Sequence, residues 1–376
     1  MSISIDTIEL LRTAILYGLL SCIIAFLWAP ILTKILYKYN ITRCPEYDAT
    51  LAMGARTSKA GVPIMGGLLI IVTVALITFF FNWERRFTWM PIGVMLLAGM
   101  LGGIDDLLNI FGQPRRTRKI AHVLRLIRVH RHWSQRLWLI LTLPWSIFKR
   151  TSLWLGSHPG KGLHVHERLI MQFAAGALTA WWVYVKLGEH WRDVHIPFDG
   201  FVNIGWWIIP LIIFFVMFTA NAVNVADGMD GLAGGSLLVT FCALTVISWI
   251  QGLHSITILN ATTVGALLTY TYFNIKPARF QMGDVGSLGL GALLAINTIV
   301  MQQMLLLPLF GFIFYLELVT VLIQIFGRTF LGRRIFRMAP LHHHFELRGW
   351  TEEKTVMRFW IIHAAFVLLG IWIALY

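Results

Sequence analysis

Residues 10–36 read LLRTAILYGLLSCIIAFLWAPILTKIL, an apolar run interrupted by only two basic residues. A helix needs about 20 such residues to cross the hydrocarbon core of a bilayer, so this run is long enough to span a membrane. It is too long for the apolar core of a signal peptide and lacks a small-residue cleavage site, so we expect no cleavable signal. The first long segment of the chain therefore predicts a membrane protein.

The composition of the whole chain agrees with this prediction. Of its 376 residues, 57% are hydrophobic and only 13% are charged, whereas soluble domains hold about 45–50% apolar and about 25% charged residues. The apolar segments lack the period-two alternation of barrel strands, so helices must satisfy their backbone groups in lipid. We predict an all-α polytopic membrane protein with about ten transmembrane helices, forming one domain over 1–376. The segments are 13–36, 63–81, 89–104, 168–186, 205–221, 235–250, 256–273, 287–301, 303–326 and 356–375.

The distribution of Lys and Arg predicts the orientation of these helices. With an outside N-terminus, one set of loops holds five of the 31 basic residues and the other set holds 26. Cytoplasmic loops carry the excess of basic residues, so we expect an inner-membrane protein with both termini in the periplasm. Leaving out the long loop 105–168 still gives 14 basic residues against five.

The net charge of +13 raises the question of a nucleic acid partner. The sequence has no helix-turn-helix, zinc-finger or RNA-binding signature, so we expect no nucleic acid and assign the charge to membrane lipids and a phosphate-rich substrate. Much of the charge lies in a basic cytoplasmic insertion at about 110–160, where basic and apolar residues are interleaved. This pattern indicates an amphipathic helix on the anionic leaflet. A solvated, partly disordered insertion is the alternative.

The few acidic residues are placed in a way that indicates a functional site. Five of the nine aspartates fall in three short stretches, each next to the end of a predicted segment on the cytoplasmic side. Carboxylates near the bilayer boundary are costly unless they bind a cation, pair or transfer protons. The clustering therefore predicts one polar cleft rather than separate helix caps. The five residues are Asp105, Asp106, Asp227, Asp230 and Asp284.

The neighbours of two of these stretches suit phosphate binding. Asn221, Asn224 and Asp227 follow one another at steps of three, so on a helix they form one polar stripe for phosphate, sugar hydroxyls or metal-bound water. Asp284 lies between glycines in the segment 282–287, where the backbone can approach a ligand closely. The next helix begins there, and its first N–H groups can receive phosphate oxygens.

Three further elements each allow more than one role. Lys59 precedes the second segment and either pairs with a phosphate or is an ordinary cytoplasmic charge. His342, His343 and His344 are consecutive, so their rings point in different directions and a three-histidine zinc site is disfavoured. Hydrogen bonding to a pyrophosphate or proton transfer is favoured over simple surface exposure. Glu317, inside the ninth segment, is either a packed and paired carboxyl group or part of a lipid path.

Together these groups suit phosphoryl transfer at a membrane boundary. A pyrophosphate donor must approach an anionic lipid phosphate, and Mg²⁺ bound by one or two carboxylates and by the phosphates offsets that repulsion. Lysine and histidine add positive charge, and the remaining task is to align the reacting oxygens. A lipid acceptor explains why the cleft lies where the helices leave the bilayer.

On these motifs the chain resembles the phospho-N-acetylmuramoyl-pentapeptide transferases, within the superfamily of polyprenyl-phosphate N-acetylhexosamine-1-phosphate transferases. The matching stretches occur in family order and cover the chain from about residue 55 to its end, except for the insertion. The stretch Pro340–Glu346, PLHHHFE, is the most specific, because it separates this branch from relatives that use N-acetylglucosamine-1-phosphate. The matching stretches are Lys59–Gly67, Gly103–Asp106, Asn221–Gly231, Met282–Leu288 and Ala339–Leu347.

The resemblance implies a homodimer of ten-helix subunits that transfers phospho-MurNAc-pentapeptide from UDP-MurNAc-pentapeptide to undecaprenyl phosphate with Mg²⁺. The products are lipid I of peptidoglycan synthesis and UMP. It implies that Asp284 binds Mg²⁺, to which we add Asp227 as a second ligand, and that Asp105 and Asp106 are the catalytic pair with Asp284. Whether the lipid phosphate attacks directly or an aspartate is first phosphorylated stays open. The predicted substrate-binding residues are Lys59, Arg168, Asn221, Asn224, Asp227, Asp230, Gln281, Ser287, His342, His343 and His344.

The chain departs from the family pattern at three positions besides the insertion. Asn109 stands where a lysine usually follows the aspartate pair. Arg168 replaces a later lysine, which keeps the charge but changes its geometry. Gln281 stands where a phenylalanine often stacks on uracil. These departures concern the nucleotide site more than the class of reaction.

Two alternative functions stay open. The nearest is a sister transferase that uses UDP-GlcNAc or another UDP-amino sugar, against which the histidine triplet argues. The more distant one is a secondary transporter, since polar residues in broken helices also mark substrate paths. Transport predicts polar residues near the middle of the membrane and inverted repeats, whereas the acidic residues here lie at one boundary.

Overall fold

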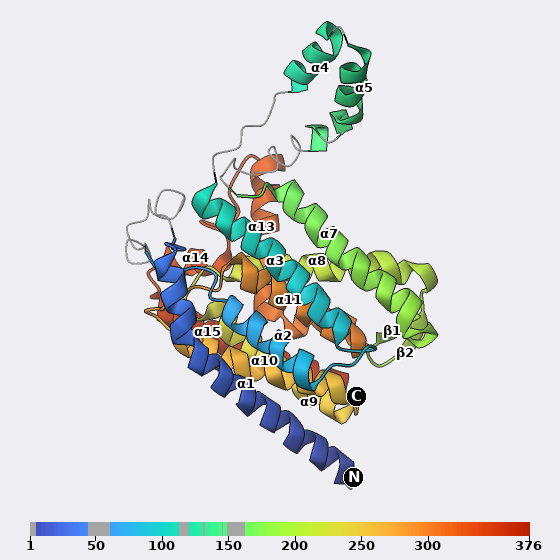
Figure 1. The fold of residues 1–376 in the computed structure, drawn as a ribbon, viewed down its shortest axis with the longest axis vertical. Helices are drawn as coiled ribbons and strands as arrows, with labels where there is room; N and C mark the ends of the chain where they lie inside the picture. Colours follow the sequence, from blue (N-terminus) through green and yellow to red (C-terminus); the bar gives the residue numbers. More distant parts are fainter. Residues whose placement is uncertain (1–4, 44–60, 113–119, 131, 145, 149–161) are drawn as a thin grey trace.

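A computed structural model describes residues 5–43, 61–112, 120–130, 132–144, 146–148 and 162–376 (Figure 1). Long α-helices dominate these residues, as the sequence predicts. Each predicted apolar segment overlaps one of the long helices. These are α1 (Ile5–Lys38), α2 (Leu68–Phe81), α3 (Trp89–Phe111), α7 (Val165–Trp182), α8 (Ile208–Ala226), α9 (Leu232–Ile250), α10 (His254–Asn274), α11 (Gly283–Val300), α13 (Phe312–Phe330) and α15 (Glu352–Ala374).

Shorter elements connect the long helices. The two strands form an antiparallel hairpin between α7 and α8, in which Val194 is paired with Val202. The short elements are α4 (Ile120–Val129), α5 (Trp133–Leu141), η4 (Val183–Leu187), η5 (Glu189–Arg192), β1 (Asp193–Ile196), β2 (Gly200–Asn203), η6 (Gly205–Trp207), η7 (Met304–Leu306), α12 (Leu307–Phe310) and α14 (Leu341–Glu346).

Among the described residues, seven helices are long and apolar enough to cross a membrane: α1, α3, α8, α9, α11, α13 and α15. Helix α2 is as apolar but has only 14 residues. The outward face of α1 shows why lipid suits the exterior, since Leu16, Leu19 and Leu27 are all more than half exposed. In water such a face would be a large unprotected apolar surface. The chain is therefore a multi-pass membrane protein, and the number of ten spans stays a prediction.

Three features differ from the sequence-based expectation. Helix α3 continues to Phe111, so Asp105 and Asp106 lie within a helix and not just beyond its end. The segment predicted at 303–326 is broken at Gly311 into α12 and α13. The β1–β2 hairpin was not predicted, because strands of four residues are too short to show an alternating pattern.

Helix α11 forms the centre of the bundle. Every residue from Val285 to Val300 is buried, and α3, α8 and α2 pack around this helix. On the outside, α1 packs against α10, and α15 packs against α9. An apolar helix that is buried on all sides is expected only at the core of a large bundle. The start of α11 therefore lies among several neighbours.

Glycine brings α3 and α11 into backbone contact. A Cβ atom at Gly102 would overlap the backbone carbonyl group of Asp284, and one at Gly289 would lie 3.1 Å from the carbonyl oxygen of Met95. Small residues let membrane helices approach this closely. The contact sets the aspartates on α3 beside the first turn of α11.

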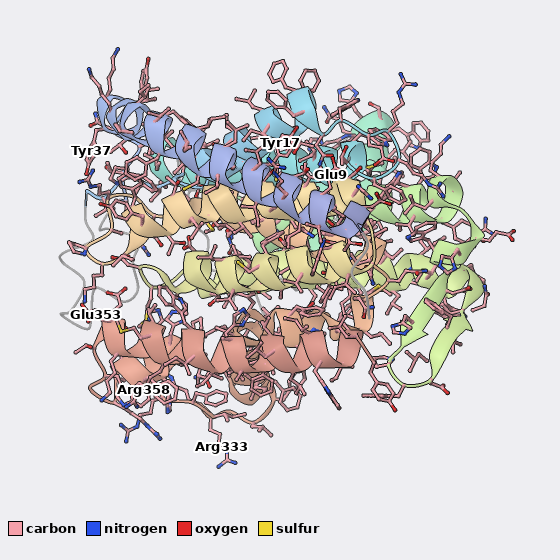
Figure 2. All side chains as sticks on the ribbon, turned by 90° about the horizontal axis from the view of Figure 1, so that it is seen from below. Glu9, Tyr17, Tyr37, Arg333, Glu353 and Arg358 are labelled. Carbon is pink, nitrogen blue, oxygen red and sulfur yellow. The ribbon has the colours of Figure 1, made fainter. Side chains whose placement is uncertain are left out.

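Both described ends of the chain lie at the end of the bundle opposite that contact (Figure 1). Trp249 at the end of α9 donates to the carbonyl oxygen of Thr7 at 2.7 Å. The ring of Tyr376 contacts the ring of Phe198 in the β1–β2 turn, with 4.8 Å between their centroids. Figure 2 shows Tyr37 and Glu353 together at the other end. The two ends of the chain therefore face one side, and the periplasmic assignment of that side stays a prediction.

Helices α4 and α5 occupy the described part of the basic insertion and are drawn apart from the bundle, beyond the ends of α3 and α7 (Figure 1). Their apolar residues are largely uncovered, with Trp133 75% and Leu141 69% exposed. Helices form there as the amphipathic pattern predicts, although residues 113–119 lie outside the described ranges. Contact with a lipid surface stays a prediction.

The glycine contact generates a stability prediction. We expect Gly102→Ala to lower the free energy of unfolding by about 1–3 kcal/mol, because the added methyl group meets backbone that cannot move aside. Gly93→Ala on the same helix is the matched control, since a Cβ there has no atom within 4 Å. Thermal unfolding in detergent checks both variants. Equal unfolding midpoints would show that α3 and α11 do not need the glycine.

Candidate active site

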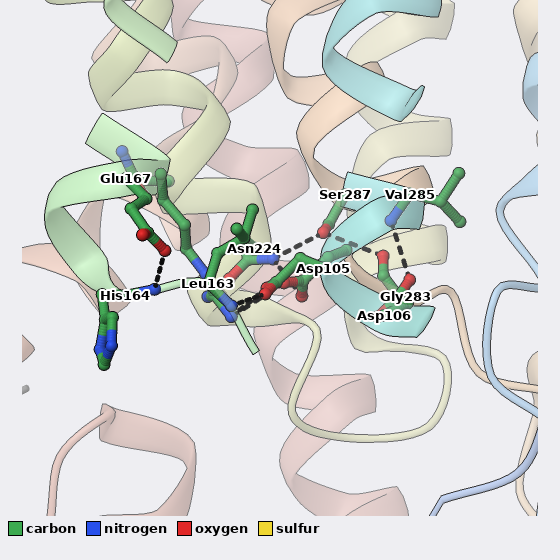
Figure 3. A network of polar contacts seen from close by, with 12 residues as sticks. Asp105, Asp106, Leu163, His164, Glu167, Asn224, Gly283, Val285 and Ser287 are labelled. Carbon is green, nitrogen blue, oxygen red and sulfur yellow. Dashed lines mark hydrogen bonds and ion pairs between the residues drawn. The ribbon is translucent and has the colours of Figure 1, made fainter. Parts of the chain in front are cut away.

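The two aspartates of α3 contact different neighbours (Figure 3). Both are buried, at 1% exposed for Asp105 and 5% for Asp106. Asp105 Oδ1 accepts a hydrogen bond from the backbone N–H of Leu163 at 2.6 Å. Asp106 Oδ2 accepts from the backbone N–H of Val285 at 3.1 Å, in the first turn of α11. This divergence follows from helix geometry, which turns adjacent side chains about 100° apart.

Arg168 lies between two of the aspartates. Helix α7 begins at Val165, where the Glu167 carboxylate accepts from the backbone N–H of His164 at 3.0 Å, and this places Arg168 in the first turn. Its guanidinium forms an ion pair with Asp105 and another with Asp284, with 3.3 Å between Nη2 and Oδ2 of Asp284. One cation thus joins acidic residues that are far apart in sequence.

The polar stripe on α8 is present, but its members face different helices. Asn224 donates to Asp284 Oδ1 at 2.7 Å and to Ser287 Oγ at 2.9 Å, both on α11. Asn221 exchanges two hydrogen bonds with Gln172 on α7, at 2.6 and 3.1 Å. The stripe therefore connects α7 and α11, and only Asn224 contacts an aspartate directly.

Gly283 brings two further carboxylates together. Its backbone N–H donates to Asp227 Oδ2 at 3.1 Å, while a Cβ on this residue would lie 2.6 Å from Asp106 Oδ2. Its φ of +73° is also one that other residues rarely adopt. Only glycine satisfies both conditions, so the backbone geometry requires glycine at position 283.

Asp227 follows α8 and lies outside the membrane-spanning segments. Burial raises its pKa to about 8, although the hydrogen bond from Gly283 and the nearby Arg43 guanidinium act in the opposite direction. A raised pKa means that the buried carboxyl group favours its neutral form near pH 7. A bound cation would favour the ionised form.

Gln281 is joined to two segments that precede α2. Its backbone N–H donates to the carbonyl oxygen of Pro63 at 2.8 Å, and its carbonyl accepts from Gly66 at 2.7 Å. The side-chain oxygen accepts from Arg43 Nη1 at 2.9 Å. Residues 61–67 of the first motif thus lie beside the start of α11, whereas Lys59 lies outside the described residues.

Sequence reasoning missed Arg43 and Gln172. Arg43 is one of many basic residues in the loops predicted to be cytoplasmic, so nothing in its spacing marked it. Gln172 could have been found, because an amide within an apolar segment indicates a polar partner inside the bundle. Both lie next to predicted site residues.

Asp230 contacts residues that come before and at the start of α15. Its Oδ2 accepts from the N–H of Ala278 at 3.4 Å, and its backbone N–H donates to Glu352 at 2.9 Å. Glu352 in turn pairs with Lys276 at 3.4 Å. These contacts connect Asp230 to the start of α15.

The three histidines lie on α14 with three different surroundings, as consecutive helical residues should. His342 is 1% exposed, and its Nδ1 lies 3.2 Å from Glu317. His343 Nδ1 lies 3.0 Å from the Glu346 carboxylate. His344 contacts the rings of Phe336 and Phe345.

The donor set of the cluster fits Mg²⁺. Within the described part of the chain, Asp284 Oδ2 is buried and accepts no hydrogen bond. No group of three or more His, Cys, Asp or Glu residues there could enclose a metal ion. Mg²⁺ prefers hard oxygen ligands and usually takes one or two carboxylates, with water and substrate phosphates completing its shell. Asp284, with Asp227 nearby, could supply that share.

The comparisons with known proteins agree with this arrangement. Residues 160–302, which contain α7, α8 and α11, match the model of glycosyl transferase family 4. This match, within a bundle of apolar helices, points to a membrane-embedded glycosyl transferase as the class of protein.

Full-length relatives narrow the class further. A phospho-N-acetylmuramoyl-pentapeptide-transferase of Chloroflexus aurantiacus is 36% identical over 330 residues, covering 84% of this chain and 78% of the relative. A protein of the same name from Levilactobacillus brevis is 32% identical, over 84% of this chain and 85% of the relative. Another from Halalkalibacterium halodurans is 29% identical, over 96% of this chain and 98% of the relative. The chain belongs to the phospho-N-acetylmuramoyl-pentapeptide-transferase family, which confirms the resemblance.

The position of Arg168 generates a second prediction. Arg168→Gln leaves buried carboxylates without their cation, so we expect the free energy of unfolding to fall by about 1.5–3 kcal/mol. Added Mg²⁺ should raise the unfolding midpoint of this variant more than that of the unchanged protein. Thermal unfolding with and without Mg²⁺ measures both effects.

Arg192→Gln is the matched control for this experiment. The Arg192 side chain is 32% exposed, close to the 30% of Arg168, but its partner Glu189 is 91% exposed and lies 3.8 Å away. An exposed pair contributes little. Equal losses in the two variants would contradict the bridging role of Arg168.

Proposed function

We propose that this protein transfers phospho-MurNAc-pentapeptide from UDP-MurNAc-pentapeptide to undecaprenyl phosphate, forming lipid I and releasing UMP. The observation that carries the proposal is the meeting of Asp105, Asp106 and Asp284 around Arg168 at the end of two membrane helices. Relatives that share most of the chain bear the name of this enzyme. The charged groups of the cluster and the family membership therefore support the same reaction.

The aspartates of α3 act on the lipid phosphate. Asp105 and Asp106 are held by different backbone donors, so one can accept a proton from the acceptor phosphate while the other fixes the start of α11. Arg168 is the nearest cation and attracts the phosphate into the cluster. The attacking oxygen is thereby oriented before the pyrophosphate bond breaks.

A cavity beside Asp105 suits an acceptor with an apolar tail. Its lining includes Asp105 and Arg168 at one side, and most of its other lining residues are apolar side chains of α3, α7, α8 and α11. A lipid phosphate could place its charged head at the arginine and its first carbon atoms against this apolar lining.

The nucleotide and sugar phosphate bind on the other side of the cluster. Asn224 and Ser287 present amide and hydroxyl groups beside Asp284. Gln281, which precedes Asp284 in the chain, is bonded to Arg43. Asp230 and the three histidines complete this side, with Lys59 preceding it in sequence. The amide of Gln281 replaces the aromatic ring found in many relatives, so it recognises the base through hydrogen bonds.

Mg²⁺, when bound, neutralises the pyrophosphate and stabilises the charge that develops on the leaving UMP. Asp284 is the proposed ligand, with Asp227 as the second. The proposal includes a homodimer in the inner membrane. Its site faces the cytoplasm, where the UDP-linked substrate is available and where the excess of basic residues is expected.

The proposal generates a third prediction. Asp284→Asn should lower the rate of UMP release at least about 100-fold at any Mg²⁺ concentration, because an amide is a poor ligand for this ion. The assay uses purified protein, UDP-MurNAc-pentapeptide and undecaprenyl phosphate, with and without EDTA. Near-normal release by this variant would remove Asp284 from its role.

Two controls define this experiment. Asp199→Asn changes an aspartate beyond β1, at the opposite end of the bundle, and should leave UMP release unchanged. Radiolabelled UDP-GlcNAc in place of the pentapeptide substrate tests the sister transferase. Transfer of its label to the lipid at a comparable rate would favour that alternative.

A further inference from the structure

Glu317 is a buried acidic residue that the proposed chemistry does not use. It lies on α13 and is fully buried, where a carboxyl group is costly unless hydrogen-bond donors surround it. The donors come from α14. Oε2 accepts from the backbone N–H of Leu341 at 2.6 Å, and Oε1 accepts from the N–H of His342 at 3.1 Å. Glu317 is therefore a packed and bonded carboxyl group.

These two N–H groups are the first of α14. The first N–H groups of a helix have no partner inside it, and the residue before the helix usually supplies one from its side chain. Here that residue is Pro340, which has no side-chain acceptor. Glu317 thus supplies, from another helix, the cap that the sequence of α14 lacks. A helix of six residues is too short to be stable alone, so this anchor decides where α14 lies.

His342 extends the anchor to the turn that carries Asp227. Its Nδ1 lies 3.2 Å from Glu317 Oε1. On the other side of the ring, a Cβ at Gly228 would overlap Nε2, so the ring packs directly on the Gly228 backbone. Glu317, His342 and Gly228 therefore form a continuous contact from α13 to the residue next to Asp227.

An apolar cluster connects the same elements independently. Met229 of the turn and Leu232 of α9 are buried with Ile313 of α13, and Leu341 and Phe345 of α14 pack against them. Apolar contact holds α14 on the turn without fixing its direction. The directional hydrogen bonds to Glu317 supply the missing orientation.

We propose that Glu317 is a positioning residue, which holds α14 so that His342 fixes the turn 227–231 beside the nucleotide site. Glu317 itself touches no substrate. The inference rests on the proposed function, because it assigns Glu317 to alignment of the UDP-linked substrate and not to the lipid. It also makes a structural claim that does not depend on any activity.

Hydrogen–deuterium exchange of the purified full-length protein tests the structural claim. We expect peptides covering 341–347 and 227–231 to exchange about tenfold faster in Glu317→Ala than in the unchanged protein, because two N–H groups lose their acceptor. Glu317→Gln should show a smaller increase, since its amide keeps one acceptor oxygen. If Glu317→Ala does not fold, Glu317→Gln carries the test alone.

Steady-state UMP release tests the link to the substrate. In Glu317→Gln, we expect KM for UDP-MurNAc-pentapeptide to rise about tenfold, while KM for undecaprenyl phosphate changes less than about twofold. A general loss of folded protein would lower the apparent rate without changing either KM. The split between the two substrates thus separates positioning from simple stability.

Gln324→Ala is the matched control on the same helix. Gln324 also accepts from two backbone N–H groups, those of Ile335 at 3.1 Å and Phe336 at 2.9 Å. Its loss should destabilise the protein and loosen the segment before α14. It should leave exchange at 341–347 and both KM values unchanged.

Three results would overturn the proposal. Unchanged exchange at 341–347 in the Glu317 variants would refute the anchor, whether or not the protein is active. Faster exchange there with unchanged exchange at 227–231 would refute the link to the turn. An unchanged KM for the nucleotide substrate would refute the link to the substrate. If the unchanged protein releases no UMP, the proposed function fails, and the exchange result still decides the anchor.

Discussion

The acid cluster depends on the backbone contact between α3 and α11. Because Gly102 has no side chain, the two helices approach until Asp106 reaches the N–H of Val285. Asp105 then faces α7, where Arg168 joins it to Asp284. Two acidic side chains pair with one arginine and Asp106 lies beside them, so carboxyl groups outnumber cations in the cluster, which suits a divalent cation. Helices, and not loops, fix these positions, which favours a well-defined geometry.

The sequence predicted the class of fold and the membership of the cluster well. Apolar runs such as 10–36 identify spanning helices because the bilayer demands a minimum length of apolar helix. An ionised carboxylate near the bilayer boundary is costly unless it binds a cation, pairs or transfers a proton. This argument grouped Asp105, Asp106, Asp227 and Asp284. These arguments use only the local sequence and the properties of the lipid bilayer. They identified aspartates that the structure brings together.

The partners within the cluster could not be predicted in the same way. Nothing in the sequence indicates that Asn221 faces Gln172 while Asn224 faces Asp284. The extension of α3 beyond residue 104 was missed because the helix continues after its apolar segment ends. Glu317 stayed undecided, since its donors lie 24 and 25 residues later in the chain. Pairings of this kind depend on how helices pack, and packing is a property of the whole bundle.

The shared location of the two described chain ends has a practical consequence. Both chain ends lie at one end of the bundle, and the aspartates lie at the opposite end of the helices (Figure 1). A fluorescent reporter or purification handle fused at either end would thus lie at the end of the bundle opposite the aspartates. Such fusions leave the entrance to the aspartate cluster clear. A partner recruited through such a handle would be held about the length of the helices away from the cluster.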